Sequence, residues 1–201
     1  AAPLPCAGPG RRAGVPAPSE GATRALAAAL AAGEVVAMSQ ARDVDPGAWF
    51  DVVDGKNLVQ MVGPATGEVR EPRRFRALGP ADVPQMTALV QLTAPGPWSE
   101  RTAELGRFLG FEQEGRLVAM AGERMRVPGY TELSGVCTHP DFRGRGLARR
   151  LSAIVCAGID ARGETPFLHA WKDNHAAIAL YEQLGFRLRA EVNVAVLERA
   201  S

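Results

Sequence analysis

Apolar residues recur at helical spacing in the second half of the chain. In the segment LARRLSAIVCAGIDARG these residues are Leu147, Leu151, Ile154, Val155 and Ile159. Steps of four, three, one and four positions place them on one face of a helix, and Gly163 is a typical helix end. The segment NHAAIALYEQLG predicts a second helix, capped by Asn174 and ended by Gly185.

Shorter apolar runs predict strands. Three of them are FRAL (75–78), TELSGVCT (131–138) and PFLHAW (166–171). The pair Glu114-Gly115 separates two further apolar runs, and such a pair is the signal of a β-hairpin. A last strand, or a pair of strands, is expected in FRLRAEVNVAVLE (186–198).

The order of these elements predicts the fold class. GPADVPQMTALVQL (79–92) is expected to be a helix, and Ser99 is expected to cap another that extends to Arg107. From residue 75 onward the elements are then a strand, two helices, three strands, a helix, a strand, a helix and a strand. This order predicts an α/β protein with an α+β arrangement, in which helices pack on a mixed sheet. A meander of three strands before the glycine-rich loop does not fit a dinucleotide-binding βαβ alternation.

The composition divides the chain into three parts. Residues 1–20 are rich in Pro, Gly and Ala, do not read as a signal peptide, and are expected to be a flexible tail. Residues 21–72 form a small N-terminal subdomain with a helix and two strands. The Pro- and Gly-rich segment GPATGEVREPRR (63–74) marks a boundary, and residues 73–201 form the main domain.

The overall charge and the cysteines narrow the possible functions. The formal net charge of the 201 residues is +1, so no global field favours nucleic acid or an acidic membrane surface. The three cysteines have no framework spacing and no C-x-x-C pair, which favours a reducing compartment and no metal site. The alanine-rich run near residue 30 is too short to span a bilayer. We therefore expect a cytoplasmic protein.

The segment HPDFRGRGLARR (139–150) lies between a predicted strand and a predicted helix. A glycine turn at the start of a helix presents unpaired N–H groups and the positive end of the helix dipole to an anion. The segment lacks the Lys-Ser/Thr pair of a phosphate-binding P-loop, and its G-x-G is not completed by x-x-G. Taken alone, it fits a basic surface loop as well as a phosphate cradle.

Two motifs together resemble the GCN5-related N-acetyltransferase (GNAT) superfamily. Arg143-x-x-Gly146-x-Ala148 resembles its acetyl-CoA loop, Q/R-x-x-G-x-G/A. Its second element, N-x-x-A-x-x-L-Y-x-x-x-G-F, is matched by Asn174, Ala177, Leu180, Tyr181, Gly185 and Phe186. Within this superfamily, the sequence of the C-terminal part is most similar to the FR47-like branch. The resemblance covers roughly residues 73–201 and implies the GNAT acyl-CoA N-acyltransferase fold.

The resemblance also implies roles for particular residues. The backbone amides expected to hold the pyrophosphate of acetyl-CoA are those of Arg143, Gly144, Arg145, Gly146, Leu147 and Ala148. The residues expected to pair their backbone with the pantetheine arm are Val136, Cys137 and Thr138. Asn174 would bind the cofactor or cap its helix, two roles that are compatible. Tyr181 would donate a proton toward the thiolate leaving group.

The implied reaction is direct attack of an amine on the thioester in a ternary complex. A general base must then take the proton of the amine. Glu132 is the first candidate and Glu123 the second, although a solvent-facing strand residue is at least as good an interpretation of Glu132. Cys137 is interpreted as a small buried residue and not as a nucleophile, and His169 as a packed strand residue.

The remaining expectations concern partners. The acceptor is a small-molecule amine or an amine of a peptide or protein, and neither nucleic acid nor membrane is expected. Residues 21–72 lack the cofactor loop and could be a degenerate half-domain, which would form a wall of the acceptor site or an interface such as that of a homodimer. Two other functions stay open: a non-catalytic domain that binds or senses acyl-CoA, and a nucleotide-binding module.

Overall fold

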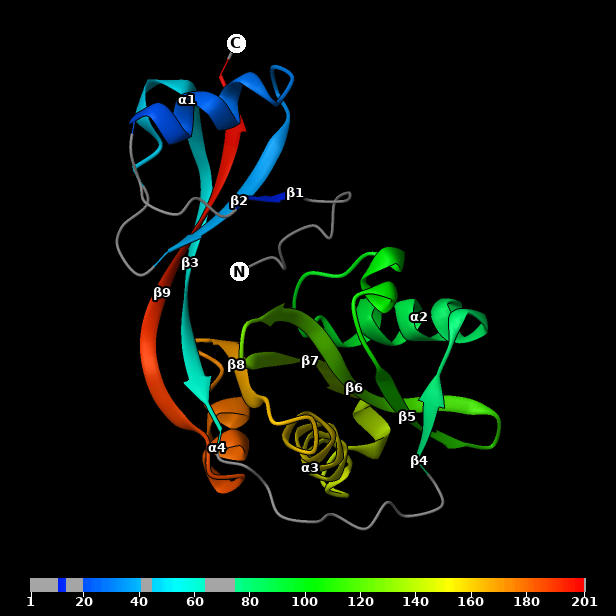
Figure 1. Ribbon diagram of the computed structural model, residues 1–201. Coiled ribbons are helices and arrows are strands. Elements are labelled where there is room, and N and C mark those ends of the chain that lie inside the picture. Colours follow the sequence, from blue (N-terminus) through cyan, green and yellow to red (C-terminus); the bar gives the residue numbers. More distant parts are fainter. Residues whose placement is uncertain (1–10, 14–19, 41–44, 64–74, 201) are drawn as a thin grey trace. The chain divides into compact units, whose positions relative to one another are not determined.

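A computed structural model describes residues 11–13, 20–40, 45–63 and 75–200. Most of the predicted tail, and the predicted boundary segment from residue 64 onward, lie outside the described residues. The chain divides into two compact units (Figure 1). Among the described residues, unit 1 comprises 61–63, 75–169 and 175–188, and unit 2 comprises 11–13, 20–40, 45–60, 170–174 and 189–200. Strands β3, β8 and β9 contribute residues to both units.

Unit 1 contains a sheet and three α-helices. Its strands are β4 (Phe75–Leu78), β5 (Phe108–Gln113), β6 (Arg116–Val127), β7 (Tyr130–Thr138) and most of β8 (Thr165–Trp171). Its helices are α2 (Val83–Thr93), α3 (Leu147–Asp160) and α4 (His175–Gln183), with short 3₁₀ turns at Pro80–Asp82, Glu100–Glu104 and Pro140–Phe142. The strand order is β8-β7-β6-β5-β4, and only the β7–β8 pair is parallel.

Helices cover both faces of the unit 1 sheet (Figure 1). Met120 on β6 packs into a cluster with Met86 and Val90 of α2. Its neighbours Ala119 and Ala121 point to the opposite face and are fully buried there, where α3 contacts β6 and β7. The apolar stripe predicted for residues 147–159 is therefore the buried face of α3.

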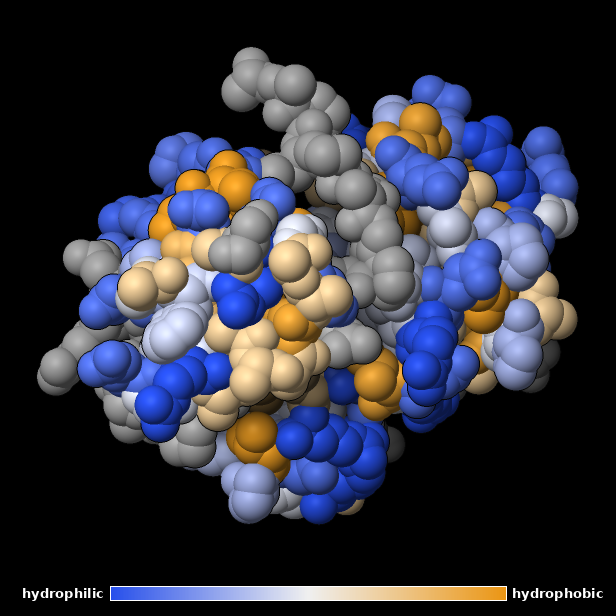
Figure 2. Space-filling model, turned by 90° about the horizontal axis from the view of Figure 1, so that it is seen from above, coloured by the Kyte–Doolittle hydropathy of each residue, from blue (hydrophilic) through white to orange (hydrophobic). Residues whose placement is uncertain are grey.

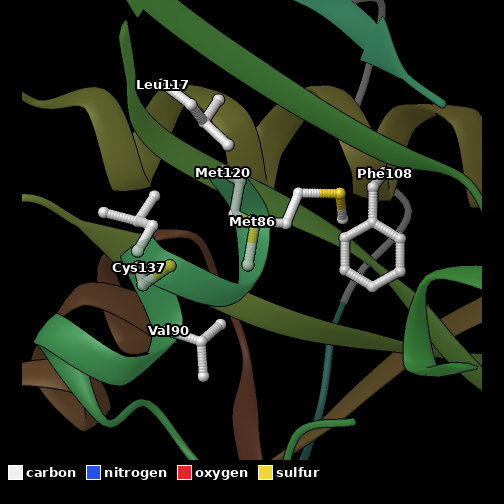
Figure 3. Packing of buried hydrophobic residues seen from close by; sticks show 7 residues of the cluster. Met86, Val90, Phe108, Leu117, Met120 and Cys137 are labelled. Atoms are coloured by element: carbon white, nitrogen blue, oxygen red, sulfur yellow. The ribbon is translucent and has the colours of Figure 1, made fainter. Parts of the chain in front are cut away.

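A bulge in β7 lies beside the ring of Phe108. This ring belongs to the apolar cluster with Met86 and Met120 in Figure 3. The register between β6 and β7 shifts between the pairs Met120↔Cys137 and Gly122↔Ser134. Gly135 lies in the shifted stretch with φ of 62°. A Cβ added at Gly122 or Gly135 would come within 2.3 Å or 2.8 Å of the Phe108 ring. The close packing of this ring thus sets where the last residues of β7 lie.

Unit 2 contains most of the two 13-residue strands, β3 and β9. Its elements are β1 (Arg11–Ala13), α1 (Glu20–Ala28), β2 (Val35–Gln40), the 3₁₀ turn Gly47–Trp49, β3 (Phe50–Val62) and β9 (Arg187–Arg199). The strand order is β1-β2-β9-β3, with β1 parallel to β2 and β2 antiparallel to β9. Ala27 of α1 packs with Val36 and Leu197 in a separate apolar cluster.

Several elements differ from the sequence-based expectation. The hairpin at Glu114-Gly115 is confirmed, and both residues have positive φ. The helix expected from Ser99 to Arg107 is only the 3₁₀ turn Glu100–Glu104. An added Cβ at Gly106 would come within 2.6 Å of the Glu123 carbonyl oxygen, so the chain is already packed against β6 there. The last strand or strand pair is one strand of 13 residues, β9.

The surface in Figure 2 mixes hydrophilic and hydrophobic residues. Large exposed apolar side chains come from several separate elements, among them Val52 of β3, Leu92 of α2 and Val127 of β6. Within the described residues, no helix is both long and apolar enough to cross a membrane.

The packing around Phe108 predicts that alanine substitutions at two glycines of unit 1 change the free energy of unfolding in opposite directions. Gly122→Ala places a methyl group against the Phe108 ring and should lower the free energy of unfolding by about 1–3 kcal/mol. Gly158→Ala, within α3, meets nothing within 4 Å and should raise it by up to about 1 kcal/mol. Urea denaturation followed by circular dichroism measures both changes. Equal effects of the two substitutions would contradict the proposed packing.

Candidate functional site

The parallel strands β7 and β8 separate partway along their length. Their pairing begins at Tyr130↔Thr165 and ends at Glu132↔Phe167. β7 continues to Thr138, and within the described part of the chain it forms no further pair with β8. The edge of β7 that faces β8 is therefore open beyond Glu132, and its backbone groups can pair with an extended ligand.

The end of β7 carries an unsatisfied polar atom. The hydroxyl oxygen of Thr138 is buried and has no hydrogen-bond partner among the described residues. The side chain of Cys137 points the other way, into the cluster with α2, and burial raises the pKa of its thiol to about 12. Cys137 is consequently an apolar packing residue at neutral pH, as the sequence suggested.

A short turn connects β7 to α3. The N–H of His139 donates to the Val118 carbonyl at 2.8 Å, which holds the turn against β6. The N–H groups of Phe142 and Arg143 donate to the carbonyl oxygens of His139 and Pro140 at 2.9 and 3.1 Å. This 3₁₀ turn reverses the chain so that the following residues lead directly into the helix.

The glycines of the loop have backbone conformations that other residues rarely adopt. Gly144 and Gly146 have φ of 75° and 72°, and Gly146 is the N-cap of α3. Among the described residues, no acceptor bonds the N–H groups of residues 144–149, and the first helical bond runs from Arg150 to the Gly146 carbonyl. Six consecutive amides thus have no acceptor among the described residues, at the positive end of the dipole of a 14-residue helix.

The arginines of the loop are partly engaged by the protein. The Nε of Arg143 lies 3.4 Å from the Thr138 carbonyl oxygen, and the guanidinium of Arg145 stacks 4.7 Å from the Phe142 ring centre. An added Cβ at Gly144 or Gly146 would meet nothing within 4 Å. The loop therefore offers open space lined by amides, with positive charge beside it.

Tyr181 is buried on α4 and packs edge-on against Phe186, with ring centres 5.9 Å apart. The N–H of Phe186 donates to the Tyr181 carbonyl at 3.0 Å, so the end of α4 fixes both rings. Burial raises the pKa of Tyr181 above its ordinary value, and Cys156 and Cys137 raise it further. The phenol therefore stays protonated at neutral pH and can act as a hydrogen-bond or proton donor.

Glu132 is 1% exposed and bonded on both oxygens. Arg124 donates to it from Nε and Nη2 at 2.8 Å each, and Nδ1 of His169 lies 2.8 Å from its Oε1. Burial raises the pKa of this carboxyl, but the hydrogen bonds from His169 and Arg124 outweigh burial and lower it to about 2. Such a carboxylate has little affinity for a proton, which weighs against the general-base role expected of Glu132.

Glu123, the second candidate base, belongs to a different network. It pairs in register with Leu133, so its side chain points to the face of the sheet opposite to that of Glu132. There it accepts hydrogen bonds from Arg126 at 2.8 Å and from both Nη atoms of Arg162 at 3.1 Å. Glu123 therefore ties the turn after α3 to the sheet.

Comparison with known proteins identifies the family. The family model described as FR47-like protein matches residues 108–195. A ribosomal protein bS18-alanine N-acetyltransferase of Escherichia coli K12 is 34% identical over 116 residues, which are 55% of this chain and 78% of that protein. A crystal structure of a GNAT-family acetyltransferase from Novosphingobium aromaticivorans matches with a TM-score of 0.84 and 43% identity, over 92% of this chain and 84% of that one. The chain belongs to the GNAT superfamily, in its FR47-like branch.

The mixed α/β fold of a GNAT acetyltransferase, expected from the sequence, is thereby confirmed. These relatives are acetyltransferases, and the chain is an enzyme of this kind. This finding favours the enzyme over the two alternative hypotheses, a non-catalytic acyl-CoA sensor and a nucleotide-binding module. Another relative, an N-alpha-acetyltransferase of Mycobacterium tuberculosis, is 33% identical over 129 residues, which are 58% of this chain and 80% of that protein. GNAT acetyltransferases use acetyl-CoA as co-substrate.

Most of the site residues expected from the sequence lie in unit 1. The expected pyrophosphate amides of residues 143–148 follow directly on the expected pantetheine strand of residues 136–138. Asn174 is the exception, because it belongs to unit 2, where it precedes α4 and its N–H donates to the Trp171 carbonyl at 3.0 Å. No group of three or more His, Cys, Asp or Glu side chains able to hold a metal occurs among the described residues.

Sequence reasoning missed the partners of Glu132. The sequence pattern indicates only a packed strand residue at His169 and gives no signal at Arg124. Arg124 lies eight residues before Glu132 and His169 lies 37 residues after it, and only the strand register brings the three together. The sequence does contain one signal of such partners, namely a glutamate within the apolar strand TELSGVCT. A carboxylate that is buried in a strand needs hydrogen-bond or charged partners.

Glu132 should make the stability of the enzyme depend on acid pH. Its pKa is about 2 in the folded chain, below the 4.5 of an unperturbed glutamate. Its stabilising contribution is therefore full above about pH 5 and is lost as the pH falls toward 2. From about pH 6 to about pH 3, the wild type should lose about 2 kcal/mol more unfolding free energy than Glu132→Gln. Urea denaturation at the two pH values measures this difference.

A suitable control is Glu104→Gln, which removes an exposed carboxylate paired with Arg101 at 3.3 Å. Exposed pairs contribute little, so this variant should follow the wild type. Glu132→Gln leaves Arg124 without its charged partner and should be less stable at both pH values, and only the change between them tests the prediction. A wild type and a Glu132→Gln variant with the same pH dependence would contradict it.

Proposed function

We propose that this chain transfers an acetyl group from acetyl-CoA to a primary amine by direct attack within a ternary complex. The observation that carries the proposal is the continuity between the open edge of β7 and the amides of residues 144–149. An extended arm that ends in a pyrophosphate matches both parts, since the arm can pair with a strand edge and the anion with a helix N-terminus.

Residues on both parts fit the acetyl-CoA molecule. Val136, Cys137 and Thr138 would pair their backbone with the pantetheine arm, and the orphaned hydroxyl of Thr138 would gain a partner. The amides of residues 143–148 would hold the pyrophosphate, with Arg143 and Arg145 at the rim. Asn174, which directly precedes α4, would cap that helix. When bound, acetyl-CoA supplies an acetyl group activated as a thioester.

Direct attack is favoured over a covalent acetyl-enzyme. Burial raises the pKa of both described cysteines, Cys137 and Cys156, to about 12. A thiol with such a pKa is hardly ionised at neutral pH and is a poor nucleophile. Tyr181, in contrast, stays protonated and would assist departure of the thiolate as a proton donor.

Among primary amines, we propose the amine of a peptide or protein N-terminus as the acceptor. Two relatives that are 34% and 33% identical are named as an alanine N-acetyltransferase of a ribosomal protein and as an N-alpha-acetyltransferase. A small-molecule amine is the alternative. An assay of CoA thiol release separates them, with an alanine-initiated peptide, an N-terminally blocked lysine peptide and small alkylamines as probes.

Tyr181→Phe tests the proposed proton donor. It removes only the hydroxyl, so kcat should fall about 100-fold or more while the Kd of acetyl-CoA stays the same. Tyr130→Phe is the matched control, because Tyr130 is 44% exposed at the start of β7. The thiol-release assay and calorimetry measure the two quantities. A Tyr181→Phe enzyme with wild-type turnover would exclude the donor role.

Gly146→Ala tests the amide cradle. The substitution disfavours the φ of 72° and should raise the Kd of acetyl-CoA about tenfold or more. Gly115→Ala is the matched control, since Gly115 has φ of 75° and equally open surroundings in the β5–β6 turn. Calorimetry should find its Kd unchanged. If both variants bind acetyl-CoA like the wild type, the loop does not hold the pyrophosphate.

A further inference from the structure

The first half of β3 extends beyond the end of β8. In the strand order β9-β3-β8, β3 has β9 on one side and β8 on the other. The N–H of Lys172, directly after the last residue of β8, donates to the Asn57 carbonyl at 3.0 Å. Because β8 ends there, no strand in the described part of the chain pairs with residues 50–56 on this side. These residues form an edge strand of unit 2.

The alternation of the backbone shows which groups point to this open edge. The carbonyl of Asn57 and the N–H of Gly63 both bond residues of β8 or the residue after it. In a strand, the backbone groups of every second residue point to the same side. The groups of Asp51 and Val53 therefore point to the open edge, and those of Val52 point to β9.

Gly55 uses a local substitute for a strand partner at this edge. Its N–H donates to Oδ1 of the preceding Asp54 at 2.7 Å. A carboxylate that bonds the neighbouring backbone amide competes with pairing to another strand, and a strand that arrives can displace it.

The side chains at the edge are aliphatic and exposed on both faces. Val52 and Val53 follow each other and point to opposite faces of the sheet, and they are 54% and 51% exposed. On β9, in contrast, Ala195 and Leu197 are buried in the cluster with α1. An exposed strand edge with β-branched side chains is a template for pairing with another strand.

The charge beside the two valines is negative. Asp51 and Asp54 flank them directly in the segment DVVD. The cations nearby are engaged elsewhere, since Nζ of Lys56 lies 5.2 Å from the centre of the Trp171 ring and Arg199 donates to main-chain carbonyl oxygens. A second copy of this edge would bring aspartates against aspartates, whereas an extended peptide with basic side chains would pair with them.

We propose that residues 50–56 of β3 bind an extended basic segment of the peptide or protein acceptor, which adds to the sheet as a further strand. The proposal rests on the proposed transfer to a peptide or protein N-terminus and assigns a binding surface to the residues that follow it. The backbone groups of Asp51 and Val53 pair with the segment, and its basic side chains face Asp51 and Asp54. Because the N-terminus and this segment belong to one acceptor chain, binding of the segment raises the effective concentration of the amine.

Hydrogen exchange of the ¹⁵N-labelled enzyme tests the strand pairing. The probe is an alanine-initiated peptide that ends in alternating arginine and valine residues, and the control peptide has glutamate in place of arginine. With saturating arginine peptide, exchange of the Val53 amide should slow by about tenfold or more, because a paired amide is protected. The Val52 amide, which points to β9, should exchange as before. The glutamate peptide should protect neither amide.

Val53→Pro tests the same pairing by kinetics. Proline removes the N–H at the open edge and is compatible with an edge strand, so the ladder to β9 is kept. The KM of the arginine peptide should rise about fivefold or more, because a backbone hydrogen bond to the segment is lost. Calorimetric binding of acetyl-CoA verifies the fold of the variant.

Asp51→Lys keeps the test decisive if Val53→Pro folds poorly. Reversal of the charge should also raise the KM of the arginine peptide about fivefold or more. Glu104→Lys is the matched control, since Glu104 is an exposed carboxylate of unit 1, and it should leave this KM unchanged.

Two results would overturn the proposed surface. One is unchanged exchange at Val53 with saturating arginine peptide, or a wild-type KM in folded Val53→Pro and Asp51→Lys. The other is protection of Val53 that rises with enzyme concentration in the absence of peptide, which would identify a second copy as the occupant. A wild-type enzyme that acetylates no amine would instead overturn the proposed function, and the exchange measurement decides on the β3 edge independently of turnover.

Discussion

The end of the β7–β8 ladder is the constraint on which the site depends. Beyond Glu132 and Phe167 the two strands no longer pair, and backbone groups in the middle of a sheet are left for something else to satisfy. An unsatisfied buried N–H or C=O costs about 1–3 kcal/mol, so such an opening persists only where the surrounding packing enforces it. Here the bulge at Gly135, wedged against the Phe108 ring, turns the last residues of β7 away from a regular ladder. The same residues lead into the turn before the amides of residues 144–149, so the open strand edge and the helix N-terminus follow each other directly along the chain.

Buried charges reinforce this arrangement on both faces of the sheet. Glu132 links β6, β7 and β8 on one face through Arg124 and His169, and Glu123 links the sheet to Arg162 on the other. Neither carboxylate is expected to add much net stability over an apolar side chain, because desolvation offsets much of the attraction. What they provide is geometry: each holds neighbouring elements in one register where the ladder itself ends. For Glu132 this register also brings Nδ1 of His169 within 2.8 Å of its Oε1.

Much of the fold could be predicted because local signals agreed with the tertiary structure. The stripe of α3, the hairpin at Glu114-Gly115 and the glycine loop each follow from short-range sequence rules, and the two motifs around Gly146 and Tyr181 together pointed to the family. The predictions that were wrong or incomplete concern residues whose structure depends on long-range packing. The segment after Ser99 ends as a 3₁₀ turn because the chain is already against β6 at Gly106, and His169 acquires its partner from a strand 37 residues away. The register of a parallel pair is set by the whole sheet, and no local pattern encodes which side chains it brings together.

The central claim is that the open edge of β7 and the amides after it form one binding surface for the CoA moiety. Titration of the ¹⁵N-labelled protein with CoA, followed by amide chemical shifts, tests it most directly. The account predicts that the largest shifts occur together at Val136, Thr138, Gly144 and Gly146, with the same apparent Kd at each. Shifts confined to other parts of the chain, or different affinities for the strand and the loop, would contradict it.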